Sequence, residues 1–194
     1  TGDANSSTKG TMTITRIRLH GDVPINENLS VYGRLGVDQA DGKAHHNGLY
    51  DTSGMLDHWG INWKYKNGSV KAGRQDVLLG QEGLVLTTLI DAVGEDNQLT
   101  GVTGIWNEGK NSLKLVGGRL GEGLFQPIPK VKANLYALQI DRKINQRLSV
   151  GATYRQIATI DKHSKAMASA FLPAYPDRIE TYSLLGNYGI DSKT

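Results

Sequence analysis

Five histidines are the residues of this chain with the most versatile chemistry: His20, His45, His46, His58 and His163. His45 and His46, with Asp41 and Asp51 in the same polar stretch, could bind a metal weakly, but adjacent histidines in a loop are more often solvated. No serine stands in a nucleophile-elbow motif, and the glycine pairs lack the spacing of phosphate-binding loops. Cysteine is absent, which removes disulfides, thiolate zinc sites and cysteine nucleophiles. We expect no enzymatic activity, no cofactor and no metal site.

The basic side chains offer a second chemistry, the electrostatic attraction of solutes. Five of them fall on the polar faces of the segments described below: Arg16, Arg18, Arg34, Lys64 and Arg155. The net charge of +3 is spread along the chain, without the clustered basic stripe that nucleic-acid binding requires. These residues therefore predict a basic wall and no nucleic-acid partner.

The composition limits the elements that could position such a wall. The 194 residues include 24 glycines and 5 prolines, and the hydrophobic fraction of 38% lies below the norm of about 45–50% for globular proteins. No run of about 18 apolar residues occurs, so transmembrane helices are excluded. A transmembrane barrel is not excluded, because each of its strands needs apolar residues on one face only.

Alternation of apolar and polar residues is the dominant pattern, and it predicts nine strands. They cover residues 11–23, 29–38, 56–66, 70–79, 98–107, 113–120, 133–143, 148–157 and 179–190. Short turns follow every odd-numbered strand, among them Asn67-Gly68, a strong hairpin signal. Long polar loops follow the others, at 39–54, 80–97, 121–132 and 158–178. This asymmetry is typical of transmembrane barrels and favours an antiparallel barrel over a sandwich or a soluble barrel.

Period 2 divides each strand into two faces. Trp59, Trp63 and Tyr65 share one face with Ile61, while His58 falls on the other. We expect the three aromatic residues to face lipid, although a sandwich strand could instead pack them inward. The polar faces are interpreted as a pore wall in preference to a solvated sheet surface. Neither face is clearly apolar in residues 98–106, so the orientation of the strands at 98–107 and 113–120 stays open.

Arg74 interrupts this pattern because it shares the apolar face of its strand with Val70 and Ala72. A charge facing lipid at mid-depth would cost about 2–4 kcal/mol. We therefore expect Arg74 to contact a protein partner, with a neighbouring subunit as the natural candidate.

Nine is an odd number of strands, whereas bacterial single-chain barrels use even numbers. No signal peptide is recognisable at Thr1, and the last residues follow a predicted strand directly. An open sheet would also leave unpaired strand edges in lipid. We expect residues 1–194 to form part of one transmembrane barrel domain, a fragment with strands missing at both ends.

Several segments resemble the general diffusion porins of Gram-negative outer membranes. The resemblance rests on Thr13-Ile-Thr-Arg-Ile-Arg-Leu19, Leu29-Ser-Val-Tyr-Gly-Arg34, Asn62-Trp-Lys-Tyr65 and Ala72-Gly-Arg-Gln75, and it covers most of residues 11–107. The segments are also similar in style to porins that carry an N-terminal S-layer-homology domain. The resemblance implies a barrel of about 16 strands, homotrimeric, in the bacterial outer membrane.

The same resemblance implies a pore eyelet. Residues 80–97 would be the constriction loop that folds into the lumen, with the acids Glu82, Asp91, Glu95 and Asp96 facing Arg16, Arg18 and Arg34 on the wall. Acid opposite base creates a transverse field that filters small polar solutes. In the family, the Gly-Arg at this strand lies on the subunit-contact side, which suits Arg74.

Two functions follow as alternatives. One is a passive diffusion channel for small hydrophilic solutes and ions. The other is an outer-membrane structural or receptor barrel with a closed lumen, whose extracellular loops bind a partner. Conductance in planar bilayers distinguishes them.

Overall fold

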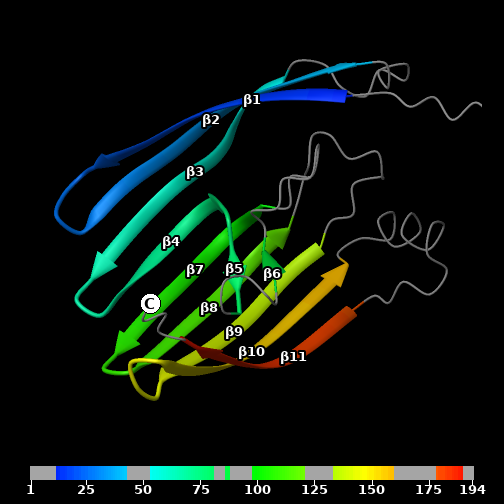
Figure 1. The fold of residues 1–194 in the computed structure, drawn as a ribbon. Helices are drawn as coiled ribbons and strands as arrows, with labels where there is room; N and C mark the ends of the chain where they lie inside the picture. The colour runs from blue at the N-terminus through cyan, green and yellow to red at the C-terminus, as the bar shows by residue number, and fades with distance from the viewer. Residues whose placement is uncertain are drawn as a thin grey trace, which may run out of the picture.

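A computed structural model describes residues 12–42, 53–80, 86–87, 98–120, 133–159 and 178–189. Most of these residues form one large curved antiparallel sheet (Figure 1). Its strands are β1 (Met12–Pro24), β2 (Leu29–Gly42), β3 (Ser53–Tyr65), β4 (Gly68–Gln75), β7 (Leu99–Glu108), β8 (Asn111–Leu120), β9 (Ala133–Lys143), β10 (Leu148–Thr159) and β11 (Arg178–Tyr188). They pair in the order β1-β2-β3-β4-β7-β8-β9-β10-β11, so each strand lies beside its neighbour in sequence apart from the excursion after β4. The nine predicted strands and the all-β class are confirmed. The sheet is open, with β1 and β11 at its edges.

The described residues contain no helix of the length and hydropathy needed to cross a membrane.

The short turns share one end of the sheet, as the alternation of turn and loop lengths predicts (Figure 1). Two of them repeat one sequence: Ile-Asn-x-x-Leu-Ser-Val occurs at residues 25–31 and again at 144–150. In both, the asparagine side chain accepts bonds from the backbone two and three residues ahead, at 2.9 Å and 2.9 Å from Asn26 and at 2.8 Å and 2.8 Å from Asn145. Such Asx turns give the backbone a local substitute for strand pairing, and they fix the hairpin register.

Successive hairpins are offset in the same direction. A backbone N–H near the end of each hairpin pair reaches back to a carbonyl in the preceding turn: Lys64 to Asn28 at 2.7 Å, Asn107 to Asn67 at 2.6 Å, Lys143 to Lys110 at 2.9 Å and Gly189 to Arg147 at 2.8 Å. A repeated stagger of this kind tilts the strands relative to the sheet axis.

The fourth strand is shorter than predicted, which corrects the boundary at residue 79. β4 ends at Gln75, and the chain then leaves the sheet at Asp76 and forms a separate short strand, β5 (Leu78–Leu79). β5 pairs only with β6 (Leu86–Thr87), and both lie on the concave side of the large sheet (Figure 1). The inward excursion therefore begins at Asp76, before the predicted loop start at Gly80.

The concave side, here called the inner face, carries a compact apolar cluster beneath residues 77–79. Leu79, Leu99 and Leu135 are fully buried there. Val77, Val116 and Ala137 complete the cluster. The opposite, outer face carries exposed apolar side chains, including Ile17, Leu19, Trp59, Ile61, Trp63, Val102, Leu115, Tyr136, Ile140, Tyr182 and Leu184. Strands β7 and β8 thus carry apolar and polar side chains on both faces, which is why alternation could not orient them.

Four glycines on the inner face pair in a row across adjacent strands: Gly60, Gly73, Gly101 and Gly118. Gly73 has a φ of 132°, and a Cβ added there would lie 2.1 Å from the carbonyl oxygen of Trp59. No side chain can occupy that position without moving the β3 backbone.

We expect Gly73→Ala to destabilise the folded sheet by about 1–3 kcal/mol, because alanine has to adopt a strained φ against backbone atoms. The matched control is Gly104→Ala in β7, where an added Cβ meets nothing within 4 Å. The urea midpoint of the folded protein measures both. Equal midpoints for the two variants would contradict the close approach at Gly73.

Candidate functional site

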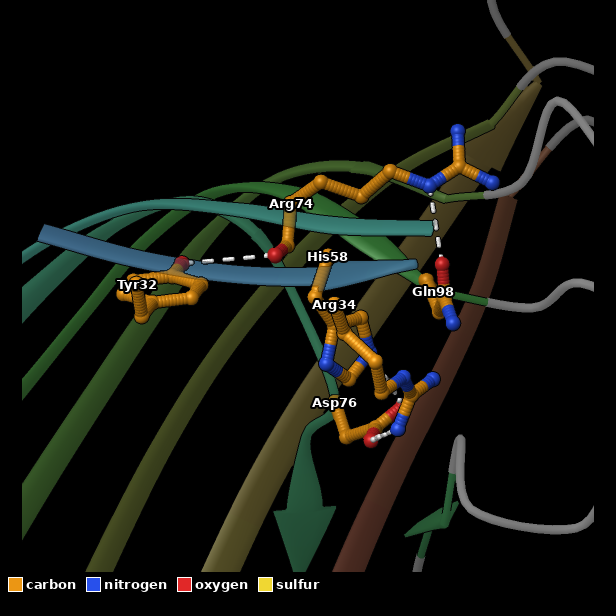
Figure 2. Close-up of polar contacts among 6 residues, drawn as sticks. All are labelled: Tyr32, Arg34, His58, Arg74, Asp76 and Gln98. Atoms are coloured by element: carbon orange, nitrogen blue, oxygen red, sulfur yellow. Dashed lines mark hydrogen bonds and ion pairs between the residues drawn. The ribbon is translucent and has the colours of Figure 1, made fainter. Parts of the chain in front are cut away.

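The most tightly organised polar group lies where the chain leaves β4 for the inner face (Figure 2). Arg34 of β2 and His58 of β3 are register partners, so their side chains project from neighbouring positions of one face. Both contact the carboxylate of Asp76: Arg34 Nη1 lies 3.5 Å from Oδ2, and His58 Nε2 lies 3.2 Å from Oδ1. Because Asp76 is the first residue after β4, this cluster fixes the point from which residues 77–80 run inward.

The cluster is withdrawn from solvent, which strengthens its charges. The side chains of Arg34 and Asp76 are 14% and 19% exposed, and that of His58 is 6% exposed. Removing one member of a buried ion pair leaves its partner uncompensated, whereas an exposed pair contributes little. Removing a side chain from the cluster of Arg34, His58 and Asp76, here called the Asp76 cluster, is therefore expected to lower the stability of the fold strongly.

A second set of contacts lies beside it on the same face. Tyr32 is buried, and its hydroxyl donates to the backbone carbonyl of Arg74 at 3.3 Å (Figure 2). The ammonium of Lys71 lies 4.2 Å from the centroid of the Tyr32 ring, within cation–π range. The inner face of β1 to β4 is thus polar but filled, with an aromatic ring packed among the charges.

The pKa of Asp76 is set by opposing effects. Burial would raise the pKa of its carboxyl group, but contact with His58 and the positive charges of His58, Arg34 and Arg18 outweigh burial and lower it. The ionised carboxylate is therefore the form that the fold stabilises.

A pKa that is lower in the folded state than in the unfolded chain contributes stability above the unfolded pKa, near 3.9, and loses it as pH falls through the folded value. We therefore expect the urea midpoint to drop between pH 5 and pH 2 by more in the natural protein than in an Asp76→Asn variant, which has no carboxyl group to protonate there. An identical acid drop in the two proteins would show that Asp76 is not a source of the pH dependence.

Residues 76–80, here called the inward segment, are held on the inner face by hydrogen bonds as well as by the apolar cluster. The amide of Gly80 donates to Gln139 Oε1 at 2.9 Å, and Lys114 Nζ donates to the carbonyl of Leu78 at 3.1 Å. These two side chains, from β9 and β8, satisfy backbone groups that would otherwise be buried without partners. The segment is consequently docked on the sheet, not suspended above it.

The predicted basic wall is dispersed over the inner face. Arg18 and Arg34 act together on Asp76. Lys64 is exposed near the short-turn end, and Arg155 lies far along the sheet on β10, where its Nε donates to Thr181 Oγ1 at 3.1 Å. Arg16 lies in β1, but its side chain is outside the described residues. The structure thus brings together two of the five residues.

Trp59, Trp63 and Tyr65 lie on the outer face and are exposed there. Arg74 pairs with Trp59 in register, so its Cβ also starts from that face. Its Nε reaches the side chain of buried Gln98 at 2.8 Å (Figure 2), which gives the arginine a partner within its own chain. A contact with a neighbouring subunit stays a prediction.

Some predicted positions lie outside the described residues. They are the constriction-loop acids Glu82, Asp91, Glu95 and Asp96, together with His45, His46, Asp51 and His163. Among the residues that are described, no group of three or more histidine, aspartate or glutamate side chains could hold a metal ion.

The sequence pattern missed Asp76 and the inner apolar cluster. The alternation predicts one strand over residues 70–79 that includes Asp76. The consecutive polar residues Gln75 and Asp76 break the period of 2 and are the signal for its end. The apolar residues that occur on both faces of β7 and β8 were the available signal for the cluster, since those of the face opposite Val102 and Leu115 also need an apolar partner.

Comparison with known proteins finds no matching protein family and no related curated protein.

Proposed function

We propose that the chain forms part of an outer-membrane β-barrel that acts as a passive diffusion channel for small hydrophilic solutes and ions. The observation that carries this proposal is the distribution of side chains between the two faces of the sheet, which is opposite to that of a soluble protein. Large apolar side chains are exposed on the outer face, while charged side chains line the concave inner face. In water such an outer face would be an aggregation hazard, whereas in lipid it is favourable.

Two further features support a membrane barrel. Exposed aromatic residues gather on the outer face near the short turns, namely Trp63, Tyr65, Trp106 and Tyr188, as in the aromatic girdle at a membrane interface. The repeated offset between hairpins is also a stagger of the kind that closing a sheet into a barrel requires. Further strands would then pair with the edges of β1 and β11, and a homotrimer would be the expected assembly.

Within this barrel, residues 76–80 would narrow the lumen from the wall of β7, β8 and β9. Their docking across the inner face supports an inward-folded constriction, with Arg18 and Arg34 on the wall beside it. The field between these arginines and acidic groups would orient polar solutes in transit.

Planar-bilayer recording of the purified protein tests the proposal. Stepwise, stable conductance increments are expected on insertion. A protein that inserts into bilayers without any open state would contradict the channel and favour the closed-lumen barrel, which would bind a partner through its extracellular loops.

We expect Arg18→Ala to shift ion selectivity toward cations, because it removes a positive charge from the inner wall. Reversal potentials in a salt gradient measure the shift, which should shrink at high salt. Arg119→Ala is the control, since Arg119 is exposed and its register partner Thr100 lies on the outer face. Equal reversal potentials for all three proteins would place Arg18 away from the conduction path.

A further inference from the structure

A hollow of about 760 Å³ lies at the short-turn end of the sheet, between the β7–β8 turn, the β9–β10 turn and the end of β11. We call it the mouth site. Among the residues that the structure describes, its lining contains three basic residues and no acidic one. The polar and charged residues of this lining include Lys110, Lys143, Asn145, Arg147, Ser149 and Asn187.

The repeated turn sequence provides an internal comparison for these charges. At residues 24–31 the turn carries Pro24 and Asn28 in the positions that Lys143 and Arg147 occupy in the second copy. The bonds within the turn are the same in both, and the bond from Gly189 to the carbonyl of Arg147 matches that from Lys64 to Asn28. The bond that the Lys143 amide donates to Lys110 has no counterpart, because Pro24 has no N–H. The turn therefore forms without basic residues, so the positive charges at 143 and 147 are not explained by the folding of the turn.

The backbone around the mouth site is held in place. The amide of Lys143 donates to the Lys110 carbonyl at 2.9 Å, and Lys110 Nζ donates to the carbonyl of Ile144 at 3.3 Å. With the bond from Gly189 to Arg147, two turns and the end of β11 are joined into one unit. A cluster of positive charges on a fixed backbone is preorganised, so a ligand does not have to order it.

The mouth site faces the same side as the inward segment. Lys143, Ser149 and Asn187 form one register row across β9, β10 and β11. Lys143 is two residues beyond Asp141 and four beyond Gln139 in β9, so all three project from the inner face. A neighbouring hollow, lined by Lys143 and Gly80 among others, lies on the same face. A ligand here would thus come from the aqueous side of the sheet and not from its apolar outer face.

We propose that the mouth site binds small anions that carry a phosphate or carboxylate group. Lysine supplies a point charge, arginine a planar donor fork, and the asparagine and serine side chains neutral donors, which together match the oxygens of such anions. A lipid headgroup shares this chemistry, but the inner-face position favours a free solute. Binding requires the folded sheet and turns only, so the site does not rest on conduction.

The test is titration of the detergent-folded protein with inorganic phosphate at low salt, followed by calorimetry. Lys143→Gln and Arg147→Gln should each weaken binding about tenfold, the loss typical of one charge-assisted contact. Lys66→Gln is the matched control, because Lys66 is an exposed basic residue of the β3–β4 turn at the same end but does not line the hollow. The electrophoretic mobility of unheated samples in SDS gels confirms that each variant is folded.

Three results would overturn the proposal: no phosphate binding, equal weakening by Lys66→Gln, or binding seen only with vesicles of anionic phosphatidylglycerol and never with inorganic phosphate. Equal weakening would indicate diffuse attraction, and vesicle-only binding would identify a lipid headgroup site. Phosphate binding without bilayer conductance would contradict the channel and leave the mouth site standing. Conductance without phosphate binding would contradict the mouth site and leave the channel standing.

Discussion

Leu79→Ala is expected to release the inward segment from the inner face and to raise single-channel conductance. Leu79 is fully buried in the cluster with Leu99 and Leu135, so truncation removes apolar contacts and leaves a cavity. Such changes cost about 2–5 kcal/mol in protein cores, which is large against the few contacts that hold a short segment. A segment that undocks more often would leave a wider lumen on average.

Amide exchange gives a direct measurement that does not depend on conduction. The Gly80 amide is bonded to Gln139, so its exchange reports undocking of the segment. A loss of 2 kcal/mol corresponds to about a 30-fold faster exchange. Leu184→Ala removes the same atoms from a side chain that is 88% exposed on the outer face, and it should leave the Gly80 amide unchanged. Unaltered exchange and conductance in Leu79→Ala would show that the apolar cluster does not hold the segment.

Asp76→Asn is expected to destabilise the protein by about 3 kcal/mol and to shift selectivity toward anions. The substitution leaves Arg34 and His58 without the carboxylate that both contact in a poorly solvated site. It also removes one negative charge from the inner face. Unfolding in urea measures the first effect, and the reversal potential in a salt gradient measures the second.

The control for Asp76 is Asp22→Asn. Asp22 lies on the same face and contacts His20 at 2.8 Å, but its side chain is 55% exposed. Exposed pairs contribute about 0–1 kcal/mol, so the control should change the unfolding midpoint little. A double-mutant cycle with Arg34→Met separates the pair from the individual side chains, and a coupling near zero would refute the role of the ion pair.

The nine long strands and their turns were predictable because the signals for them are local. A side chain's face follows from period 2 within one strand, as for Trp59 and His58 on β3. Asn67-Gly68 and the asparagines at 26 and 145 determine turns through their own backbone preferences and bonds. Local chemistry therefore fixed the order of strands, the position of the short turns and the two faces of β1 to β4.

The candidate site was less predictable because its partners are distant in the chain. Period 2 predicts Arg18 and Arg34 as charges of one face. It does not predict Asp76 as their partner, since nothing near residue 76 in sequence indicates a contact with residues 34 and 58. The acids expected to oppose them at 82, 91, 95 and 96 lie outside the described residues, so that part of the eyelet stays a prediction.

The sequence by itself determined which segments form strands and which side chains share a face. The tertiary structure alone decided that the chain leaves the sheet at Asp76, that β5 docks on an apolar patch of an otherwise polar face, and that three basic residues meet at the mouth site. The physical reason is that docking depends on groups separated by long stretches of chain, such as Gly80 and Gln139, 59 residues apart. Their meeting is set by the register of four successive strands of the sheet, β4, β7, β8 and β9, which no local pattern encodes.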